Sequence, residues 1–222
     1  MAFLQRLFTN LQYFNTESKK DLCSSNTSTC YTIEANEISK EEMNESNAYF
    51  NKDKEGTKYC AKVSKEVLTK ASQQEKLLHE VLVLKNVVHP AVLEFKGFNL
   101  YDFENTPHPT LITLYMENGS VQDFIDKKIT LNDTQKQIII IGVASAMRYL
   151  HYLKIAHCNL KPSNVLLDEN YYPRICDFGI KRKYSKDDYN VNISPEMLDQ
   201  EVANFDFDKN QYNDIYSFAI SM

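Results

Sequence analysis

The residues of this chain most suited to chemistry are the stretch His157–Asn164, which reads His-Cys-Asn-Leu-Lys-Pro-Ser-Asn, and the later triplet Asp177-Phe178-Gly179. Asn164 offers a carboxamide oxygen and Asp177 a carboxylate, and magnesium accepts both kinds of ligand. The carboxamide of Asn159 can hydrogen-bond a hydroxyl group but cannot take its proton at neutral pH. The triplet alone is a common turn, so its meaning depends on the elements around it.

Local patterns predict a strand-rich N-terminal part with one helix, followed by a mainly helical part. Polar turn residues between short apolar runs predict two hairpins, over Asn47–Val63 and Val165–Cys176. The other predicted elements are a helix over Gln73–Val88 that ends at His89-Pro90, strands over Val92–Phe98 and Thr110–Met116, a helix to about Leu153 with a capping box at Thr130–Asp133, and a helix from about Asp214.

Composition narrows the class of protein. The 222 residues suit one domain or two small lobes, and 43% hydrophobic with 25% charged residues is ordinary for a globular protein. A formal net charge of −5 gives no general attraction to nucleic acid. No apolar run approaches the ~20 residues of a membrane helix. These features favour a cytoplasmic protein without nucleic acid as a partner or a stable membrane span.

The five cysteines lack a C-x-x-C pair, which favours free thiols in a reducing compartment over a zinc site. Met1–Phe14 carries apolar residues at helical spacing, and Asn15–Tyr31 is a polar linker. Two interpretations of Met1–Phe14 stay open. It is either a helix packed on its own domain or a helix that docks on a partner or a membrane surface.

Several motifs in one order resemble the eukaryotic protein kinase family over about Ile33–Met222. They are Tyr59-Cys60-Ala61-Lys62, Glu80 on the following helix, Leu111–Ser120, His157–Asn164, Asp177-Phe178-Gly179, Ser194-Pro195-Glu196 and Asp214–Phe218. Lys161 is the Ser/Thr-kinase form of the loop, and the motif Asp214–Phe218, with Gly119-Ser120 and the Lys-Pro-Ser-Asn form, is most similar to tyrosine-kinase-like Ser/Thr kinases. The resemblance implies an α+β, bilobal fold with a β-rich N-lobe containing one main helix and a mainly helical, C-terminally truncated C-lobe. The implied division is 1–31 for the N-terminal segment and linker, 32–116 for the N-lobe and 117–222 for the C-lobe.

The resemblance also implies roles for individual residues. Lys62 would contact phosphate and pair with Glu80, Thr113 would be the gatekeeper beside the adenine, and Asn164 and Asp177 would hold metal ions. Asn159 stands where the family places its catalytic aspartate, and Lys161 would contact the transferring phosphate. The implied cofactor-binding residues are Lys62, Glu80, Cys60, Thr113, Leu114 and Met116.

The chain departs from the family pattern in four places. Asn159 replaces the proton acceptor, which is worth ~10²–10⁴-fold in rate. None of the five glycines falls near Glu41–Ser46, where a glycine-rich loop is expected, so ATP and magnesium binding should be weakened. Cys158 replaces the arginine that pairs with an activation-loop phosphate. The segment Asp177–Glu196 is short, and the helices after Met222 are missing, which would expose apolar residues of the last helix.

Three interpretations follow. The leading one is a Ser/Thr-type pseudokinase with little or no activity that acts in signalling by binding protein partners and still binds ATP. The alternatives are a weakly active Ser/Thr kinase that transfers the ATP γ-phosphate and a non-functional truncated paralogue.

Overall fold

A computed structural model describes residues 42–43, 48–52, 56–64, 67, 81–99, 102, 106–178, 192–198 and 207–222. The predicted N-terminal helix and linker, Glu80 and most of the segment between Gly179 and Glu196 lie outside the described residues. The chain divides into two compact units. The first unit is Met1–Lys85 with Phe95–Leu114, and the second is Asn86–Glu94 with Tyr115–Met222.

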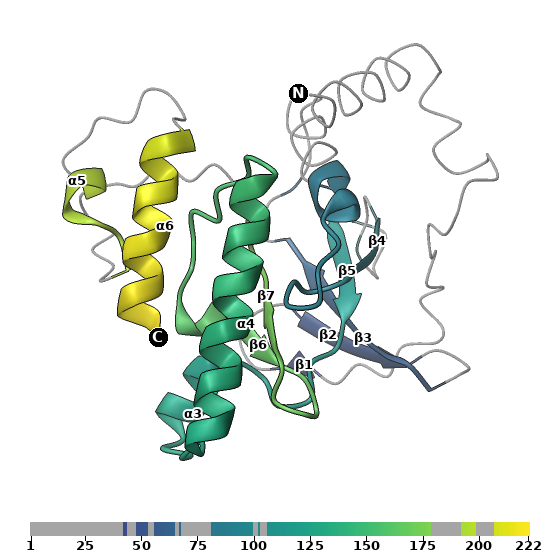
Figure 1. Ribbon diagram of the computed structural model, residues 1–222. Helices are drawn as coiled ribbons and strands as arrows, with labels where there is room; N and C mark the ends of the chain where they lie inside the picture. Colours follow the sequence, from purple (N-terminus) through teal and green to yellow (C-terminus); the bar gives the residue numbers. More distant parts are fainter. Residues whose placement is uncertain are drawn as a thin grey trace, which may run out of the picture. The chain divides into compact units, whose positions relative to one another are not determined.

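The first unit contains a five-stranded antiparallel sheet in the order β1-β2-β3-β5-β4 (Figure 1). Its strands are β1 Glu42–Met43, β2 Ala48–Lys52, β3 Lys58–Val63, β4 Phe95–Asn99 and β5 Thr110–Leu114. The pairing of β2 with β3 confirms the first predicted hairpin, and Gly56, at φ 87°, lies in the connection where a positive φ favours glycine. The predicted strands after residue 91 are confirmed with shifted ends.

The register of β3 and β5 sorts the sheet's side chains onto two faces. Ala61 pairs with Ile112, and both are buried. Cys60 pairs with Thr113 and Lys62 with Leu111, so these four side chains share the opposite face. The alternation therefore places an ammonium group, a thiol and a hydroxyl on one side of the sheet.

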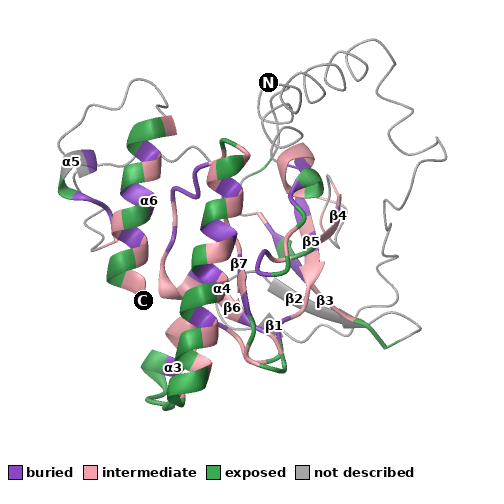
Figure 2. Ribbon diagram, viewed as in Figure 1, coloured by how far each residue is buried: buried purple, intermediate pink, exposed green. Residues whose placement is uncertain are grey.

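The second unit is mainly helical. Its elements are α3 Val121–Asp126, α4 Asp133–Tyr152, η3 Pro162–Asn164, β6 Val165–Leu167, β7 Pro173–Ile175, α5 Pro195–Leu198 and α6 Phe207–Ser221. Strands β6 and β7 form the predicted second hairpin. The inward side of α4 supplies the buried Val143, Ala146 and Leu150 (Figure 2). No helix in the described part of the chain has the length and apolar character needed to cross a membrane.

Helix α4 packs closely on the hairpin at Gly142. A Cβ atom at this position would lie 2.4 Å from Cγ of Pro173 and 3.0 Å from its Cδ. Glycine costs ~1 kcal/mol relative to alanine in a helix, and the contact with β7 explains why the residue is nevertheless there. Helix α4 precedes the stretch His157–Asn164 and the β6–β7 hairpin follows it, so the elements on either side of this stretch are in direct contact.

Three predicted boundaries need correction. The N-cap of α4 is Asn132, which accepts from the Gln135 backbone N–H, rather than Thr130. The helix at residues 81–86 ends before Val87–Val88, and α6 begins at Phe207 rather than near Asp214. The start of α6 was missed because its buried face is polar and so lacks the apolar period that predicts a helix.

The buried residues of α6 are Asn210, Asn213, Asp214 and Ser217. Their side chains bond neighbouring segments: Asn213 Oδ1 accepts from Ser194 N at 2.8 Å, and Ser217 Oγ donates to Asn192 O at 2.5 Å. On the other side, Ile215 is 55% exposed. Helix α6 is therefore held by side-chain hydrogen bonds to backbone, while part of its apolar surface faces outward.

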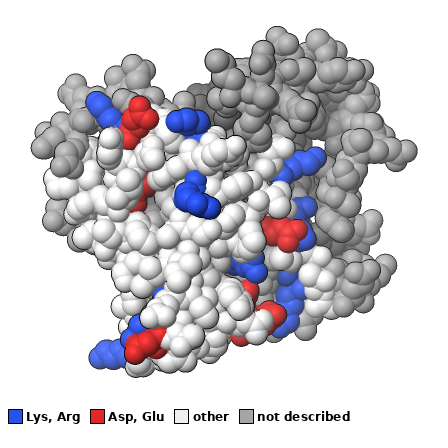
Figure 3. Space-filling model, in the orientation of Figure 1, with Lys and Arg blue, Asp and Glu red and all other residues white. Residues whose placement is uncertain are grey.

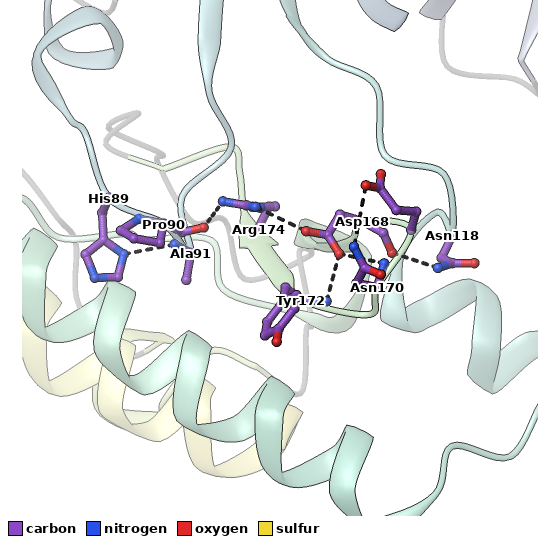
Figure 4. Close-up of polar contacts among 9 residues, drawn as sticks. His89, Pro90, Ala91, Asn118, Asp168, Asn170, Tyr172 and Arg174 are labelled. Atoms are coloured by element: carbon purple, nitrogen blue, oxygen red, sulfur yellow. Dashed lines mark hydrogen bonds and ion pairs between the residues drawn. The ribbon is translucent and has the colours of Figure 1, made fainter. Parts of the chain in front are cut away.

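The segment before β4 is tied to the β6–β7 hairpin by polar contacts (Figure 4). Arg174 donates to the Pro90 carbonyl and forms an ion pair with Asp168, with Nη2 3.1 Å from Oδ2. His89 Nδ1 accepts from Ala91 N at 3.1 Å, so the neutral ring carries its proton on Nε2, 3.2 Å from Ser145 Oγ. These bonds require His89 to be neutral.

We expect the stability of the protein to fall as the pH drops below about 6.5, the ordinary histidine pKa, and His89→Asn to weaken this dependence. Partial burial, with Arg148 and Arg174 nearby, lowers the pKa of His89 in the folded protein. The unfolded chain then binds more protons in that pH range, so acid favours unfolding. Asparagine can accept the Ala91 N–H without titrating. Urea midpoints measured across this range test the prediction, and identical pH profiles for the two proteins would contradict it.

Candidate functional site

The stretch His157–Asn164 is held in place by one buried carboxylate. Asp214 is fully buried, and its Oδ2 and Oδ1 accept from His157 N at 2.7 Å and Cys158 N at 2.8 Å. His151, which lies on α4, has its Nε2 2.8 Å from Asp214 Oδ2 and provides a third hydrogen bond to this carboxylate. Helices α4 and α6 lie side by side in Figure 1, which agrees with this contact. Three donors thus converge on Asp214, and the loop's entry is fixed from two helices.

Cys158 adopts a conformation that few side chains favour. Its φ is 63°, and a non-glycine residue in the left-handed region costs of order 1–3 kcal/mol. This conformation turns two consecutive backbone N–H groups toward Asp214. The thiol is buried and lies 3.4 Å from Asn210 Oδ1. The position where the family has a surface-reaching arginine is here an interior contact with α6.

Asn159 contacts Asp177 directly. Its Nδ2 lies 3.1 Å from Asp177 Oδ2. A carboxylate at neutral pH only accepts hydrogen bonds, so the amide must present its N–H₂ group. Of the two predicted metal-binding residues, Asn164 and Asp177, only Asp177 has a carboxylate. One of its two oxygens therefore already accepts a hydrogen bond from Asn159.

Asn164 connects the loop to the strand that leads to Asp177. Its Nδ2 donates to Asn159 O at 2.7 Å, and its own carbonyl accepts from Cys176 N at 3.0 Å. Phe178 is buried with its ring 6.1 Å from the His157 ring in an edge-to-face arrangement. Side chains and backbone together therefore hold the two predicted metal-binding residues, Asn164 and Asp177, in the same small region.

Lys161 is the basic residue within the stretch His157–Asn164. Its backbone carbonyl accepts from Asn164 N at 2.9 Å, which begins the η3 turn. Charged side chains of both signs are interspersed on the face shown in Figure 3.

In the first unit, the structure brings together three of the predicted cofactor-binding residues. Cys60, Lys62 and Thr113 share a face of the sheet, whereas Leu114 pairs with Tyr59 and lies on the opposite face. Burial raises the pKa of the Cys60 thiol, and the charge of Lys62 lowers it to a smaller extent. Leu114 can therefore offer its backbone, but not its side chain, to a ligand on the Cys60 face.

Met116 belongs to the second unit and is buried. A turn follows it, in which Gly119 N donates to Met116 O at 3.2 Å and Gly119 O accepts from Leu167 N at 2.8 Å. Gly119 has a φ of 68°, and a Cβ atom there would lie 2.8 Å from Asp123 Oδ2. Glycine is therefore required in the turn after Met116, one of the predicted cofactor-binding residues.

Each unit has its own candidate ligand-binding groups. Lys62 in the first unit and Lys161 in the second each carry an ammonium group, which can contact a phosphate. Within the described ranges, no group of three or more His, Cys, Asp or Glu side chains could hold a metal ion. The candidate cation ligands are one carboxylate, already bonded by Asn159, and the amide of Asn164. Mg²⁺ takes one or two carboxylates together with phosphate oxygens and water, so Asp177 supplies the minimum number of carboxylates, and Asn159 competes with a cation for its Oδ2.

Comparison with known proteins decides the family. A model of the protein kinase domain matches residues 44–222 of the chain. The chain belongs to the protein kinase domain family. The β-sheet unit and the mainly helical unit agree with the predicted α+β kinase fold.

The relatives of this kinase domain carry names of serine/threonine kinases. It is 37% identical over 128 residues to Serine/threonine-protein kinase ULK3 of Xenopus laevis, covering 57% of the chain and 26% of that protein. It is 35% identical over 112 residues to RUNKEL of Arabidopsis thaliana, covering 50% and 8%, and 28% identical over 173 residues to CTR1 of the same plant, covering 74% and 20%. The chain thus spans less than a third of each of these relatives' length.

Sequence reasoning about the kinase domain missed two residues of the loop's support. Asp214 was noted only as part of a helix motif, and His151 was not singled out. A buried acidic residue in the Asp214–Phe218 motif was the available signal, because an acidic side chain is rarely buried without partners. The role of His151 had no local signal, since its partner lies on another helix.

Proposed function

We propose that this protein is a catalytically impaired kinase domain of the Ser/Thr type, which binds a nucleotide and acts in signalling through protein partners. The observation that carries the proposal is Asn159, whose amide donates to Asp177. An amide in this position cannot take a proton from a substrate hydroxyl. Asn159 can still hydrogen-bond the substrate hydroxyl and orient it, but it cannot act as a general base.

The surviving features favour binding. Lys62, Thr113 and Cys60 lie on one face of the first unit's sheet, which suits contacts to phosphate and to an adenine. The loop around Asn159 retains a defined conformation through Asp214 and Asn164. Cys60, Cys158 and Cys176 form no disulfide among the described residues, which is compatible with the proposed cytoplasmic location.

One observation favours a weakly active Ser/Thr kinase as the second candidate. Lys161 is retained within the stretch His157–Asn164, and a lysine can stabilise charge on a transferring phosphate without taking a proton. Loss of a general base alone costs ~10²–10⁴-fold, which would leave measurable turnover in an otherwise complete site.

We expect the purified protein to bind ATP but not to transfer its γ-phosphate faster than the Asp177→Ala variant. The measurement has two parts. Thermal denaturation with and without ATP reports binding, and transfer of labelled γ-phosphate to a generic Ser/Thr substrate reports turnover. Transfer by the wild type that Asp177→Ala abolishes would establish the weak kinase instead. The absence of any ATP effect would contradict nucleotide binding.

Asn159→Asp serves as the companion variant. We expect it to raise transfer by less than about tenfold, because restoring a base does not restore a glycine-rich loop. A gain of about a thousandfold would mean that Asn159 alone accounts for the impaired catalysis and that the rest of the site is competent for phosphoryl transfer.

A further inference from the structure

We propose that the amide of Asn159 takes the place of a divalent cation at Asp177, so that this domain binds its nucleotide without a metal. The inference rests on the proposed nucleotide binding and adds the chemical form of the ligand, a free nucleotide rather than its magnesium complex. It also assigns Asn159 a positioning role that differs from the loss of a base.

The geometry gives the amide the contact that a cation would make. Nδ2 of Asn159 lies 3.1 Å from Asp177 Oδ2, so the amide already offers a positively polarised hydrogen to one of the two oxygens of the carboxylate that would hold a metal ion. Asp177 itself has a φ of 64°, a conformation that needs support from its surroundings. The hydrogen bond from Asn159 and the burial of Phe178 both contribute to that support.

The Asn159 amide is itself held in place. The Asn159 backbone carbonyl accepts from Asn164 Nδ2 at 2.7 Å, and its backbone N–H donates to His157 Nδ1 at 3.3 Å. Both contacts fix the backbone from which the side chain projects. The donor is therefore preorganised, and its bond to Asp177 costs little further ordering.

The charges of the region point the same way. Asn159 and Asn164 are neutral, so Asp177 brings the single acidic charge among these three residues. An aspartate at position 159 would place two carboxylates within hydrogen-bond distance, which repel each other unless a cation or proton lies between them. The wild-type region lacks this repulsion, so no cation is needed between residues 159 and 177.

The test compares ATP binding by calorimetry in excess EDTA and in saturating MgCl₂. The wild-type dissociation constant should differ by less than about threefold between the two buffers, whereas Asn159→Asp should bind at least about tenfold more weakly in EDTA than in MgCl₂. Asn132→Asp is the matched control, because it adds the same charge at the exposed N-cap of α4, where aspartate also caps well. This control should behave as the wild type.

A second measurement needs no nucleotide. MgCl₂ alone should leave the melting temperature of the wild type unchanged and should raise that of Asn159→Asp, because only the variant has paired carboxylates to stabilise. A wild type that requires magnesium for ATP, or that is itself stabilised by magnesium alone, overturns the inference. So does an Asn159→Asp variant that gains no response to magnesium. If ATP binds in neither buffer, the proposed function fails, and this second measurement still decides the role of Asn159.

Discussion

Asp214→Ala is expected to lower the free energy of unfolding by ~3–5 kcal/mol, because it leaves three donors without their acceptor. The backbone N–H groups of His157 and Cys158 and the Nε2–H of His151 all converge on this carboxylate. Asp214 is fully buried, so water does not readily replace it. Urea unfolding followed by circular dichroism measures the loss. We also expect weaker ATP binding, since the loop loses its anchor.

The control for this variant lies on the same helix. Asp208 is exposed, and Asp208→Ala should change the free energy of unfolding by only about 0.5 kcal/mol. Equal effects of the two substitutions would mean that any carboxylate on α6 matters through helix charge alone. A loss below about 1 kcal/mol for Asp214→Ala would show that the loop is held mainly by other contacts.

The elements with strong local signals were predictable from the sequence. Strands β2 and β3 follow from a polar turn between apolar runs, and α4 follows from a helical apolar period that ends in the buried Leu150. The kinase motifs then placed these elements in one fold, because their order is specific even where each motif alone is weak. Prediction worked where the side chains that define an element also face its core.

Helix α6 shows why the remainder was harder to predict. Its buried face carries Asn213 and Asp214, whose partners lie on segments distant in the sequence, and its exposed face carries Ile215. An apolar period therefore gives no correct starting residue. The contact between Asn159 and Asp177 has the same character, since it joins two positions that no local pattern relates.

The face of Leu114 could have been deduced in part. Alternation along β5 places Thr113 and Leu114 on opposite faces, but only the register with β3 shows that Cys60 and Lys62 share the Thr113 face. The sequence suggested a set of cofactor-binding residues, and pairing of strands separates the side chains that can meet a ligand from the one that can offer only backbone.

Phe178→Ala is expected to destabilise the second unit by ~3–5 kcal/mol and to weaken ATP binding at the same time. The ring is buried against His157, at 6.1 Å between centroids, and it follows Asp177 directly. Removing the ring opens a cavity and loosens the backbone at residue 178. Because this residue is adjacent to Asp177, the Asp177 carboxylate is then held less firmly near Asn159. Urea unfolding measures the first effect and calorimetry with ATP the second.

Phe178→Leu separates packing from ring geometry. Leucine refills most of the volume, so the loss should stay below about 1.5 kcal/mol, and the edge-to-face contact accounts for ~0.5–1.5 kcal/mol of it. If ATP binding depends on how firmly Phe178 holds Asp177, the leucine variant should bind nearly as the wild type and the alanine variant should not. Equal ATP affinity in all three proteins would mean that Asn159, rather than the buried ring, is sufficient to hold the carboxylate.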